Sequence, residues 1–423
     1  MTMQYQRIKG AEDYYPQQKA VWKAVADKLA ENARKFGFQQ VDFPAVETIK
    51  LLMAKSGEEV RQQIFVLEKK GAEELGLRFD LTVPMTRMFV AKQRELAKPV
   101  KWFSLDRMWR YEAPQKGRER EFRQLSVELF GSDKPEADAQ CINLIIACME
   151  SFGLTSKEVM LKINNRKLLE GLLLEVTTKE KFGDLLRTID KSNKIGPIEF
   201  AEECKKLGLN AQQIEVVKKI ISCKGDASIL ESVKKLKLNE EATKGLAELE
   251  NVLQFVNKEY ITIDLSVARG LAYYTGNVYE CFDREGKYRA LAGGGRYDQL
   301  VELFGGEPTP ATGFAIGMST LMIVLEDKGL LPKIELGPEY YVAPVNEAMI
   351  PKAMEIAAKL REKYTVDIDL MRRKLVKQFE YANSISAKKI VIVGEKDLAE
   401  NKVTVRDLKT GEEEKIPLSK ILQ

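Results

Sequence analysis

Residues 107–131 read RMWRYEAPQKGREREFRQLSVELFG. Two apolar segments flank a Pro-Gln-Lys-Gly turn, which predicts a strand, a loop and a second strand. Basic and aromatic residues crowd around the loop: Arg107, Arg110, Lys116, Arg118, Arg120 and Arg123, with Trp109, Tyr111 and Phe122. Guanidinium groups pair with phosphate oxygens and an aromatic face stacks on a base, so the pattern favours a nucleotide ligand. A solvated surface loop is the alternative for this stretch taken alone.

Two later segments strengthen the nucleotide interpretation. Residues 267–281 read VARGLAYYTGNVYEC, in which Arg269 precedes a glycine and two tyrosines lead through a Thr-Gly turn into a strand. Residues 292–298 read AGGGRYD, and such glycines let the backbone approach a ligand closely. Each segment is a weak signal by itself, because GGG also occurs in bulges and turns. Their order along one chain is specific.

Composition limits the class of protein. A chain of 423 residues is long enough for two or three domains, and a net charge of +4 is too small to indicate nucleic-acid binding without local clusters. No apolar run has the length of a membrane span, and residues 1–10 contain no apolar signal core, so a soluble cytoplasmic protein is expected. The five cysteines form no CxxC pair and are expected to be reduced thiols.

The chain contains no histidine. Histidine general bases, histidine metal ligands and Ser-His-Asp triads are therefore excluded. Any catalysis must use other groups, or a substrate that is already ionised at neutral pH.

Hydrophobic periodicity divides the chain. A helix is expected from Gln17 to Phe36, and then a strand in FQQVDFPAVE that Pro44 interrupts. The segments LGLRFDLTVP (75–84) and KWFSLDRMWRYE (101–112) alternate like strands. Residues 156–258 have a Leu/Lys/Glu periodicity that predicts a mainly helical insertion, and after a Pro/Gly-punctuated linker at 329–339 strands and helices alternate as in a small α/β domain.

These motifs resemble those of the histidyl-tRNA synthetases, a family of class II aminoacyl-tRNA synthetases. The resemblance extends from KGAEDYYP near the N-terminus to VTVRDLKTGEEEKIPL near the C-terminus and is weakest at 156–258. The RGL-x-YYTG pattern discriminates most, because it marks the histidine enzymes among their class II relatives. The resemblance implies an α+β fold: a class II antiparallel sheet core with flanking helices in a catalytic domain (1–328) that contains the helical insertion, and a C-terminal α/β anticodon-binding domain (340–423).

The resemblance also implies an activity, namely ATP-dependent activation of L-histidine and its transfer to tRNA(His), with Mg²⁺ on the ATP phosphates and no metal site on the protein. The attacking group is then the carboxylate of the substrate, which needs no protein base. Arg110 and Arg269 are expected to be catalytic, because fixed cations stabilise the charge that builds at the α-phosphate. The ATP-binding residues implied are Arg110, Glu112, Arg118, Phe122 and Arg269.

Further residues are implied for the other substrates. The histidine-binding set is Asp80, Thr82, Gln124, Glu128, Arg269, Tyr273 and Tyr274, with Glu128 and Tyr274 on the imidazole nitrogens and Tyr273 also a candidate for the core. Contacts with tRNA are expected from Gln115, Lys116, Arg372 and Lys374. A homodimer is expected, since class II cores pair through the N-terminal helix and strand.

The chain departs from the family pattern at several positions. Ala272 occupies a position usually held by aspartate, Glu12 one where arginine is common, and Ser319 and Thr320 replace a Glu-Arg pair whose arginine normally braces the γ-phosphate. Either another cation, such as Arg118 or Arg296, substitutes, or ATP binds weakly. Two alternatives follow: a catalytically inactive paralogue that senses histidine or uncharged tRNA, and a class II synthetase for threonine, proline or glycine, which would leave RGLAYYTG unexplained.

Overall fold

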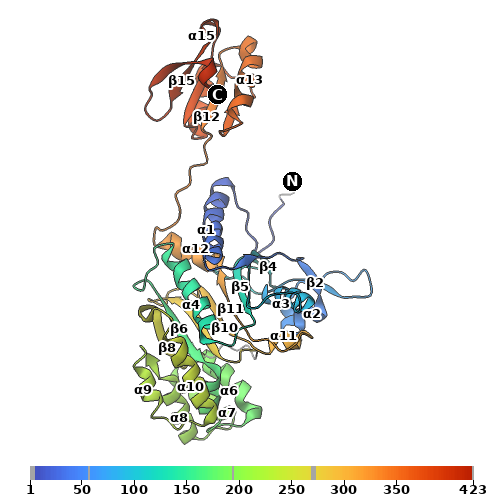
Figure 1. Cartoon of the computed structure of the whole chain (residues 1–423), viewed down its shortest axis with the longest axis vertical. Coiled ribbons are helices and arrows are strands. Elements are labelled where there is room, and N and C mark those ends of the chain that lie inside the picture. The colour runs from blue at the N-terminus through green and yellow to red at the C-terminus, as the bar shows by residue number, and fades with distance from the viewer. Residues whose placement is uncertain (1–4, 56–57, 193–194, 268–272, 422–423) are drawn as a thin grey trace. The chain divides into compact units, whose positions relative to one another are not determined.

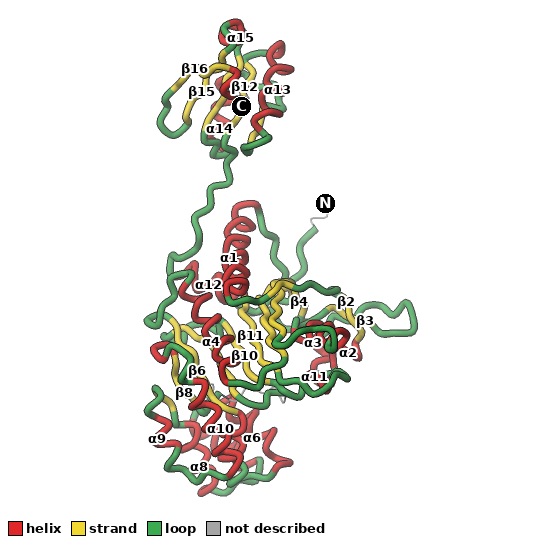
Figure 2. Tube along the Cα trace, viewed as in Figure 1, coloured by secondary structure: helices red, strands yellow, loops and turns green. Residues whose placement is uncertain are grey.

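A computed structural model describes residues 5–55, 58–192, 195–267 and 273–421 (Figures 1 and 2). The chain forms two compact units, one of residues 1–13 and 22–331 and the other of residues 14–21 and 332–423. Each unit has its own sheet and core.

A nine-stranded sheet forms the centre of the first unit. Its strand order is β1-β4-β5-β11-β10-β9-β6-β8-β7, and the run from β4 to β6 is antiparallel throughout. The strands are β1 (Gln39–Gln40), β4 (Val100–Trp109), β5 (Glu121–Phe130), β6 (Val159–Asn165), β7 (Lys224–Gly225), β8 (Ile261–Asp264), β9 (Asn277–Asp283), β10 (Ala292–Arg296) and β11 (Ala311–Gly317). Segments separated by more than 150 residues in sequence are therefore neighbours in the sheet.

The two faces of this sheet have different partners. Leu125, Val127 and Leu129 of β5 belong to a core shared with α1 (Pro16–Lys35), α4 (Pro135–Glu150) and α12 (Met318–Asp327). The alternate residues of β5 lie on the opposite face, because side chains along a strand alternate. On that face Trp102 and Phe130 pack with Phe89 of α3 (Thr82–Lys92).

Helix α1 shows why the sequence forms these elements. Its buried residues include Trp22, Val25, Ala26, Leu29 and Ala33, a helical spacing that leaves one apolar stripe against the sheet. Gly37, with φ of +81°, follows the last turn and allows the chain to leave the helix.

Short elements surround α3. A two-stranded sheet of β2 (Val46–Thr48) and β3 (Leu75–Leu77) precedes it, with α2 (Ile49–Met53) and the 3₁₀ helix η1 (Glu58–Gln63) between the two strands. Helix α11 (Leu300–Leu303) lies against α3.

The prediction of a strand over residues 75–84 is correct only at its start. β3 ends at Leu77, and α3 begins at Thr82. The Asp80 carboxylate accepts a hydrogen bond from the Val83 backbone N–H at 3.0 Å, and an acceptor in that position satisfies a free donor in the first turn of a helix. Alternating hydrophobicity in so short a segment did not reveal this helix start.

Residues 166–258 are mainly helical. The helices are α5 (Arg166–Leu173), α6 (Lys179–Lys191), α7 (Pro197–Lys206), α8 (Ala211–Ile221), α9 (Ile229–Val233) and α10 (Glu240–Val252), followed by the 3₁₀ helix η2 (Lys258–Tyr260). β6, just before them, is a strand of the central sheet, so the segment is attached directly to that sheet.

The second unit contains a five-stranded sheet of order β13-β12-β14-β15-β16. Its elements are β12 (Tyr340–Pro344), η3 (Glu347–Met349), α13 (Ile350–Leu360), β13 (Val366–Ile368), α14 (Leu375–Ser384), β14 (Lys389–Val393), α15 (Glu395–Ala399), β15 (Lys402–Asp407), β16 (Glu413–Pro417) and α16 (Leu418–Ile421). Val342 packs with α13, whereas Tyr341 and Ala343 pack with Ala382 of α14, so helices cover both faces. This is the α/β arrangement that the alternating pattern predicts.

The packing of the helical segment at residues 166–258 can be tested at the contact between α5 and α10. A Cβ atom on Gly245 of α10 would lie 2.2 Å from the Leu168 backbone nitrogen of α5. Gly245→Ala should therefore lower the free energy of unfolding by about 1–3 kcal/mol through overpacking. Gly183→Ala is the matched control: Gly183 lies on α6 with nothing within 4 Å of the added methyl group, and the change should stabilise by about 0.5–1 kcal/mol. Equal midpoints in urea titrations of the two variants would contradict the close approach.

Candidate active site

The basic loop singled out in the sequence is a β-hairpin. Strands β4 and β5 pair in antiparallel register from Val100 opposite Phe130 to Trp109 opposite Glu121. Beyond them, two backbone hydrogen bonds between Gln115 and Arg118 close a tight turn in which Gly117 has φ of +73°. The predicted strand, loop and strand are confirmed, and the charged residues lie on an ordered hairpin.

Arg110 lies where β4 passes into the loop of this hairpin. Its Nε donates to the Phe79 carbonyl at 3.0 Å, and its guanidinium carbon lies 5.0 Å from the centre of the Phe122 ring. A guanidinium held against an aromatic ring has limited freedom. The structure thus brings together two of the residues predicted for ATP.

Glu112 and Arg118 form an ion pair across the hairpin, and their side chains are 12% and 40% exposed. The Glu112 backbone carbonyl also accepts a hydrogen bond from Arg120 Nε at 3.0 Å. Arg118 is the more accessible partner, so its pair with Glu112 is open to exchange with an anionic ligand.

Three predicted residues share one face of β5. Phe122, Gln124 and Glu128 are separated by even numbers of residues and so point to the same side of the sheet. Gln124 Nε2 donates to Ser126 Oγ at 2.8 Å, and Ser126 lies on the same face. The predicted adenine-stacking residue and the predicted imidazole-binding residue therefore lie along one strand.

Glu128 is the most unusual group of the site. It is 2% exposed, lies between Trp102 of β4 and Gly313 of β11 in register, and its Oε2 has no hydrogen-bond partner. Burial raises the pKa of Glu128 to about 8, although the Thr82 side chain and the Lys55 ammonium offset part of the rise. A buried carboxyl with an unpaired oxygen is a site for a polar ligand.

Asp80 and Thr82 reach this region from the start of α3. Asp80 Oδ1 accepts from the Val83 N–H, and its Oδ2 lies 3.1 Å from Lys55 Nζ. Thr82 and Asp80 both influence the pKa of Glu128. These three members of the predicted histidine-binding set are thus electrostatic neighbours.

Tyr273 and Tyr274 extend the site. Their ring centres lie 4.4 Å apart, and Tyr274 is 6% exposed. A Cβ on Gly295 would lie 2.9 Å from the Tyr274 ring, which explains the need for glycine in β10. Tyr273 is half-buried and packs against the core cluster that contains Phe89, Trp102 and Phe130. Arg269 and Ala272 lie outside the described residues.

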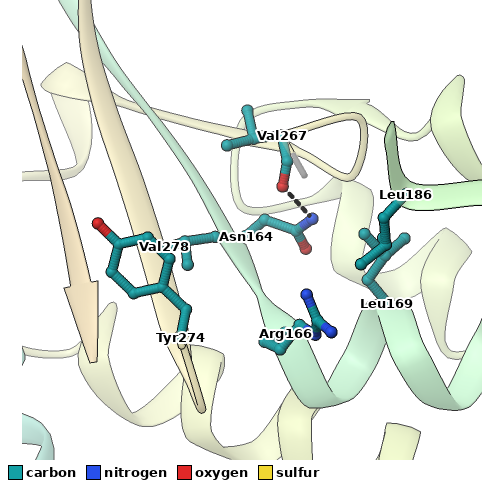
Figure 3. A pocket seen from close by; sticks show the side chains of 7 residues that line it. All are labelled: Asn164, Arg166, Leu169, Leu186, Val267, Tyr274 and Val278. Atoms are coloured by element: carbon teal, nitrogen blue, oxygen red, sulfur yellow. Dashed lines mark hydrogen bonds between the residues drawn. The ribbon is translucent and has the colours of Figure 1, made fainter. Parts of the chain in front are cut away.

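Tyr274 also lines a small pocket at the start of the helical segment. Figure 3 shows the pocket, whose lining residues are Asn164, Arg166, Leu169, Leu186, Val267, Tyr274 and Val278. Asn164 Nδ2 donates to the Val267 carbonyl at 3.0 Å, and this bond ties β6 to the chain that leads towards RGLAYYTG. The helical segment therefore contacts the site through β6.

Comparisons with known proteins identify the family of the chain. The profile of the histidyl-tRNA synthetase family matches residues 10–321, and that of the anticodon-binding domain family matches residues 339–423. The chain belongs to the histidyl-tRNA synthetase family. The histidine–tRNA ligases of Haloarcula marismortui and Pyrococcus horikoshii are 38% and 40% identical to it, over 98% and 99% of this chain and 96% and 97% of theirs. The crystal structure of histidyl-tRNA synthetase from Nostoc sp. PCC 7120 superposes with a TM-score of 0.82 at 26% identity, covering 99% of this chain and 98% of that one.

Membership of the histidyl-tRNA synthetase family confirms the resemblance, the fold class and the enzyme class predicted from the sequence. These relatives give no support to a catalytically inactive paralogue. The departures at Ala272 and Thr320 are therefore features of a chain that otherwise matches the family over its whole length.

The structure narrows the search for a cation that replaces the missing arginine of this family. Thr320 is buried at the start of α12, where neighbouring Ser319 Oγ donates to Glu119 Oε2 of the hairpin at 2.9 Å. Arg296 is not available, because its 7% exposed side chain is paired with Asp138 at 3.0 Å and Asp298 at 3.1 Å. Arg118 remains the candidate for the replacing cation, because it lies next to Thr320. A Cβ on Gly117, the residue before Arg118, would lie 3.4 Å from Thr320 Oγ1.

The residues predicted to contact tRNA occupy exposed turns. Gln115 and Lys116 are exposed at the hairpin tip. In the second unit, Arg372 and Lys374 lie between β13 and α14, and Arg372 has φ of +52° and pairs with Glu347 at 3.4 Å. Since the two pairs belong to different units, the structure does not place them in one surface.

Sequence reasoning missed three residues beside Glu128. Lys55 pairs with Asp80, and a Cβ on Gly313 would lie 2.4 Å from both Glu128 Oε2 and the Tyr297 hydroxyl, which has no hydrogen-bond partner. Tyr297 follows the GGGR sequence directly, so its position next to a glycine-rich strand was the available signal. Lys55 gave no signal, because it is one of many lysines.

Two further findings concern the described part of the chain. It contains no group of three or more cysteine, aspartate and glutamate side chains arranged to hold a metal ion. None of its helices is both long and apolar enough to cross a membrane.

The raised pKa of Glu128 predicts a pH-dependent stability. Between about pH 4.5 and about 8 an unfolded carboxyl ionises while Glu128 in the folded protein stays protonated, so its contribution to stability is lost as the pH rises. Glu128→Gln should remove this dependence, and the difference in slope should be up to about 1.4 kcal/mol per pH unit. Urea titrations at several pH values measure it. Glu326→Gln, at an exposed position of α12, is the control, and parallel pH curves for wild type and Glu128→Gln would contradict the assignment.

Proposed function

We propose that this chain activates L-histidine with ATP and transfers it to tRNA(His), using the sheet face that carries Phe122, Gln124 and Glu128. The observation that supports this most directly is the arrangement of β5: an arginine–aromatic pair at its beginning and a buried, partly unpaired carboxyl further along. The first suits a nucleotide and the second a small polar ring. Adenylate formation requires the two substrates side by side.

The hairpin supplies the ATP side of this proposal. The histidine carboxylate attacks the α-phosphate and pyrophosphate leaves, so negative charge builds on the phosphate oxygens. Arg110 donates to the α-phosphate, its position fixed by Phe79 and Phe122. Phe122 stacks on adenine, Glu112 accepts from it, and Arg118 moves from Glu112 to the outer phosphates. Arg269 is assigned the opposite side of the α-phosphate by sequence alone.

Magnesium enters as the substrate MgATP. Its ligands are then phosphate oxygens and water, which Mg²⁺ commonly keeps. The ion offsets phosphate charge, and the residues of the chain orient the reactants.

The amino acid lies against Glu128 and Tyr274 in this proposal. Asp80, Thr82 and Gln124 receive the α-ammonium group, and Glu128 and Tyr274 bind the two imidazole nitrogens. A ligand without ring nitrogens leaves Glu128 unpaired in a buried site, which costs several orders of magnitude in rate. Histidine specificity then needs no editing domain.

The remaining parts of the proposal concern partners. Lys116 and Gln115 approach the acceptor end of tRNA, Arg372 and Lys374 contact its anticodon arm, and two chains associate as a homodimer in the cytoplasm. The support for the tRNA contacts is the exposure of these residues and the match of residues 339–423 to an anticodon-binding domain. Sedimentation at micromolar concentration, giving twice or once the chain mass of 48.0 kDa, decides the oligomeric state.

Pyrophosphate exchange tests the activation step. Exchange into ATP should require histidine and Mg²⁺, and Arg110→Ala should lower kcat by on the order of 10²–10³-fold with a smaller change in KM, because the lost donor acts mainly in the transition state. Arg107→Ala is the control, because Arg107 is an exposed arginine of β4, and it should retain wild-type exchange. Exchange that is independent of histidine, or unaffected by Arg110→Ala, would overturn the proposal.

The transfer of histidine to tRNA can be measured separately from histidine activation. Lys116→Ala should slow transfer to tRNA about tenfold while leaving pyrophosphate exchange unchanged, since the exposed Lys116 side chain is assigned no contact with ATP or histidine. Single-turnover transfer from preformed adenylate is the measurement. A parallel loss of both activities would place Lys116 in the ATP site instead.

A further inference from the structure

Lys55 is a buried cation among the predicted histidine-binding residues. It follows α2, and only 5% of its side chain is exposed. Its Nζ lies 3.1 Å from Asp80 Oδ2 and 4.2 Å from the centre of the Tyr273 ring. The Lys55 ammonium therefore contacts both the Asp80 carboxylate, at the start of α3, and the Tyr273 ring, in the RGLAYYTG segment.

Stability does not account for this ion pair. Lysine is almost never fully buried, and removing both charges from water costs about as much as their attraction returns. An apolar pair of similar volume would stabilise the fold at least as well. The pair therefore points to a role in the site.

The local charges indicate what that role is. Asp80 and Glu128 are neighbouring carboxyl groups, and the Lys55 ammonium is the positive charge beside them. Without it, the Asp80 carboxylate would lie in a poorly solvated space without a counter-ion, and it would lose one of the two contacts that fix it. The Tyr273 ring would lose its cation as well.

We propose that Lys55 is a positioning residue of the histidine site, which holds the Asp80 carboxylate and the Tyr273 ring where the amino acid meets them. This inference rests on the proposed function. Asp80 has acceptor capacity left for an α-ammonium group, because a carboxylate offers about four acceptor sites and the Val83 N–H and Lys55 use two. Lys55 acts through Asp80 and Tyr273, and the substrate binds to them.

Calorimetric titration with L-histidine tests the inference without requiring catalysis. Lys55→Met, which keeps the length and removes the charge, should weaken histidine binding at least about tenfold, whereas Lys55→Arg should restore it to within about threefold. The KM for ATP in pyrophosphate exchange should stay within about twofold. Lys50→Met, on the exposed side of α2, is the matched control and should bind histidine like the wild type.

The outcomes separate the two proposals. If the wild type binds histidine and Lys55→Met binds it equally well, or if histidine and ATP weaken by the same factor, the positioning role is overturned and the proposed function stands. If the wild type binds no histidine, the proposed function fails and the inference fails with it.

An Asp80→Asn background provides a second measurement in case Lys55→Met folds poorly. There the lysine change leaves no buried carboxylate unpaired at Asp80, and it should alter histidine affinity less than about threefold, because two residues that act as a unit are not additive. A further tenfold loss in that background would show that Lys55 acts independently of Asp80, and would overturn its proposed action through that carboxylate.

Discussion

The close approach of β11 to the Glu128 carboxyl is the constraint on which the site depends. Gly313 lies opposite Glu128, and a side chain there would collide with Glu128, the Tyr297 hydroxyl and the Val127 carbonyl. Gly295 on the next strand leaves the corresponding space for the Tyr274 ring. Two facing glycines therefore create the room beside a buried carboxyl and two tyrosines. The sheet supplies this room by pairing strands that are far apart in the sequence.

In the proposed function, electrostatics in this confined space is the means by which a chain without histidine recognises histidine. Glu128 has a raised pKa because it is buried, and it becomes useful when a ligand donor satisfies its unpaired oxygen. Asp80 stays fixed between the Val83 N–H and the Lys55 ammonium. The reaction needs no histidine base, because the substrate carboxylate is already ionised. The main contribution of the chain to the reaction is then the placement of cations and hydrogen-bond acceptors.

The hairpin illustrates what sequence could predict. The charged loop between β4 and β5, the alternation of Phe122, Gln124 and Glu128, and the helices and strands of residues 340–423 all follow local periodicity, and the structure contains them. The start of α3 was misread, because Asp80 begins a helix through one side-chain hydrogen bond that a pattern of apolar residues does not encode. Arg296 was a candidate cation until its buried pairing with Asp138 was known.

The sequence by itself determined the family, the order of elements and most residues assigned to the substrates, because motifs and periodicity are local properties of the chain. Only the tertiary structure decided which of these residues meet. Lys55 pairs with Asp80, and the strand register sets Gly313 beside Glu128. The Tyr297 hydroxyl, which has no hydrogen-bond partner, lies at the same place. These contacts are between segments that are distant in sequence. Burial and charge balance arise from such contacts. They determine the pKa of Glu128 and the role proposed for Lys55, and no single segment contains them.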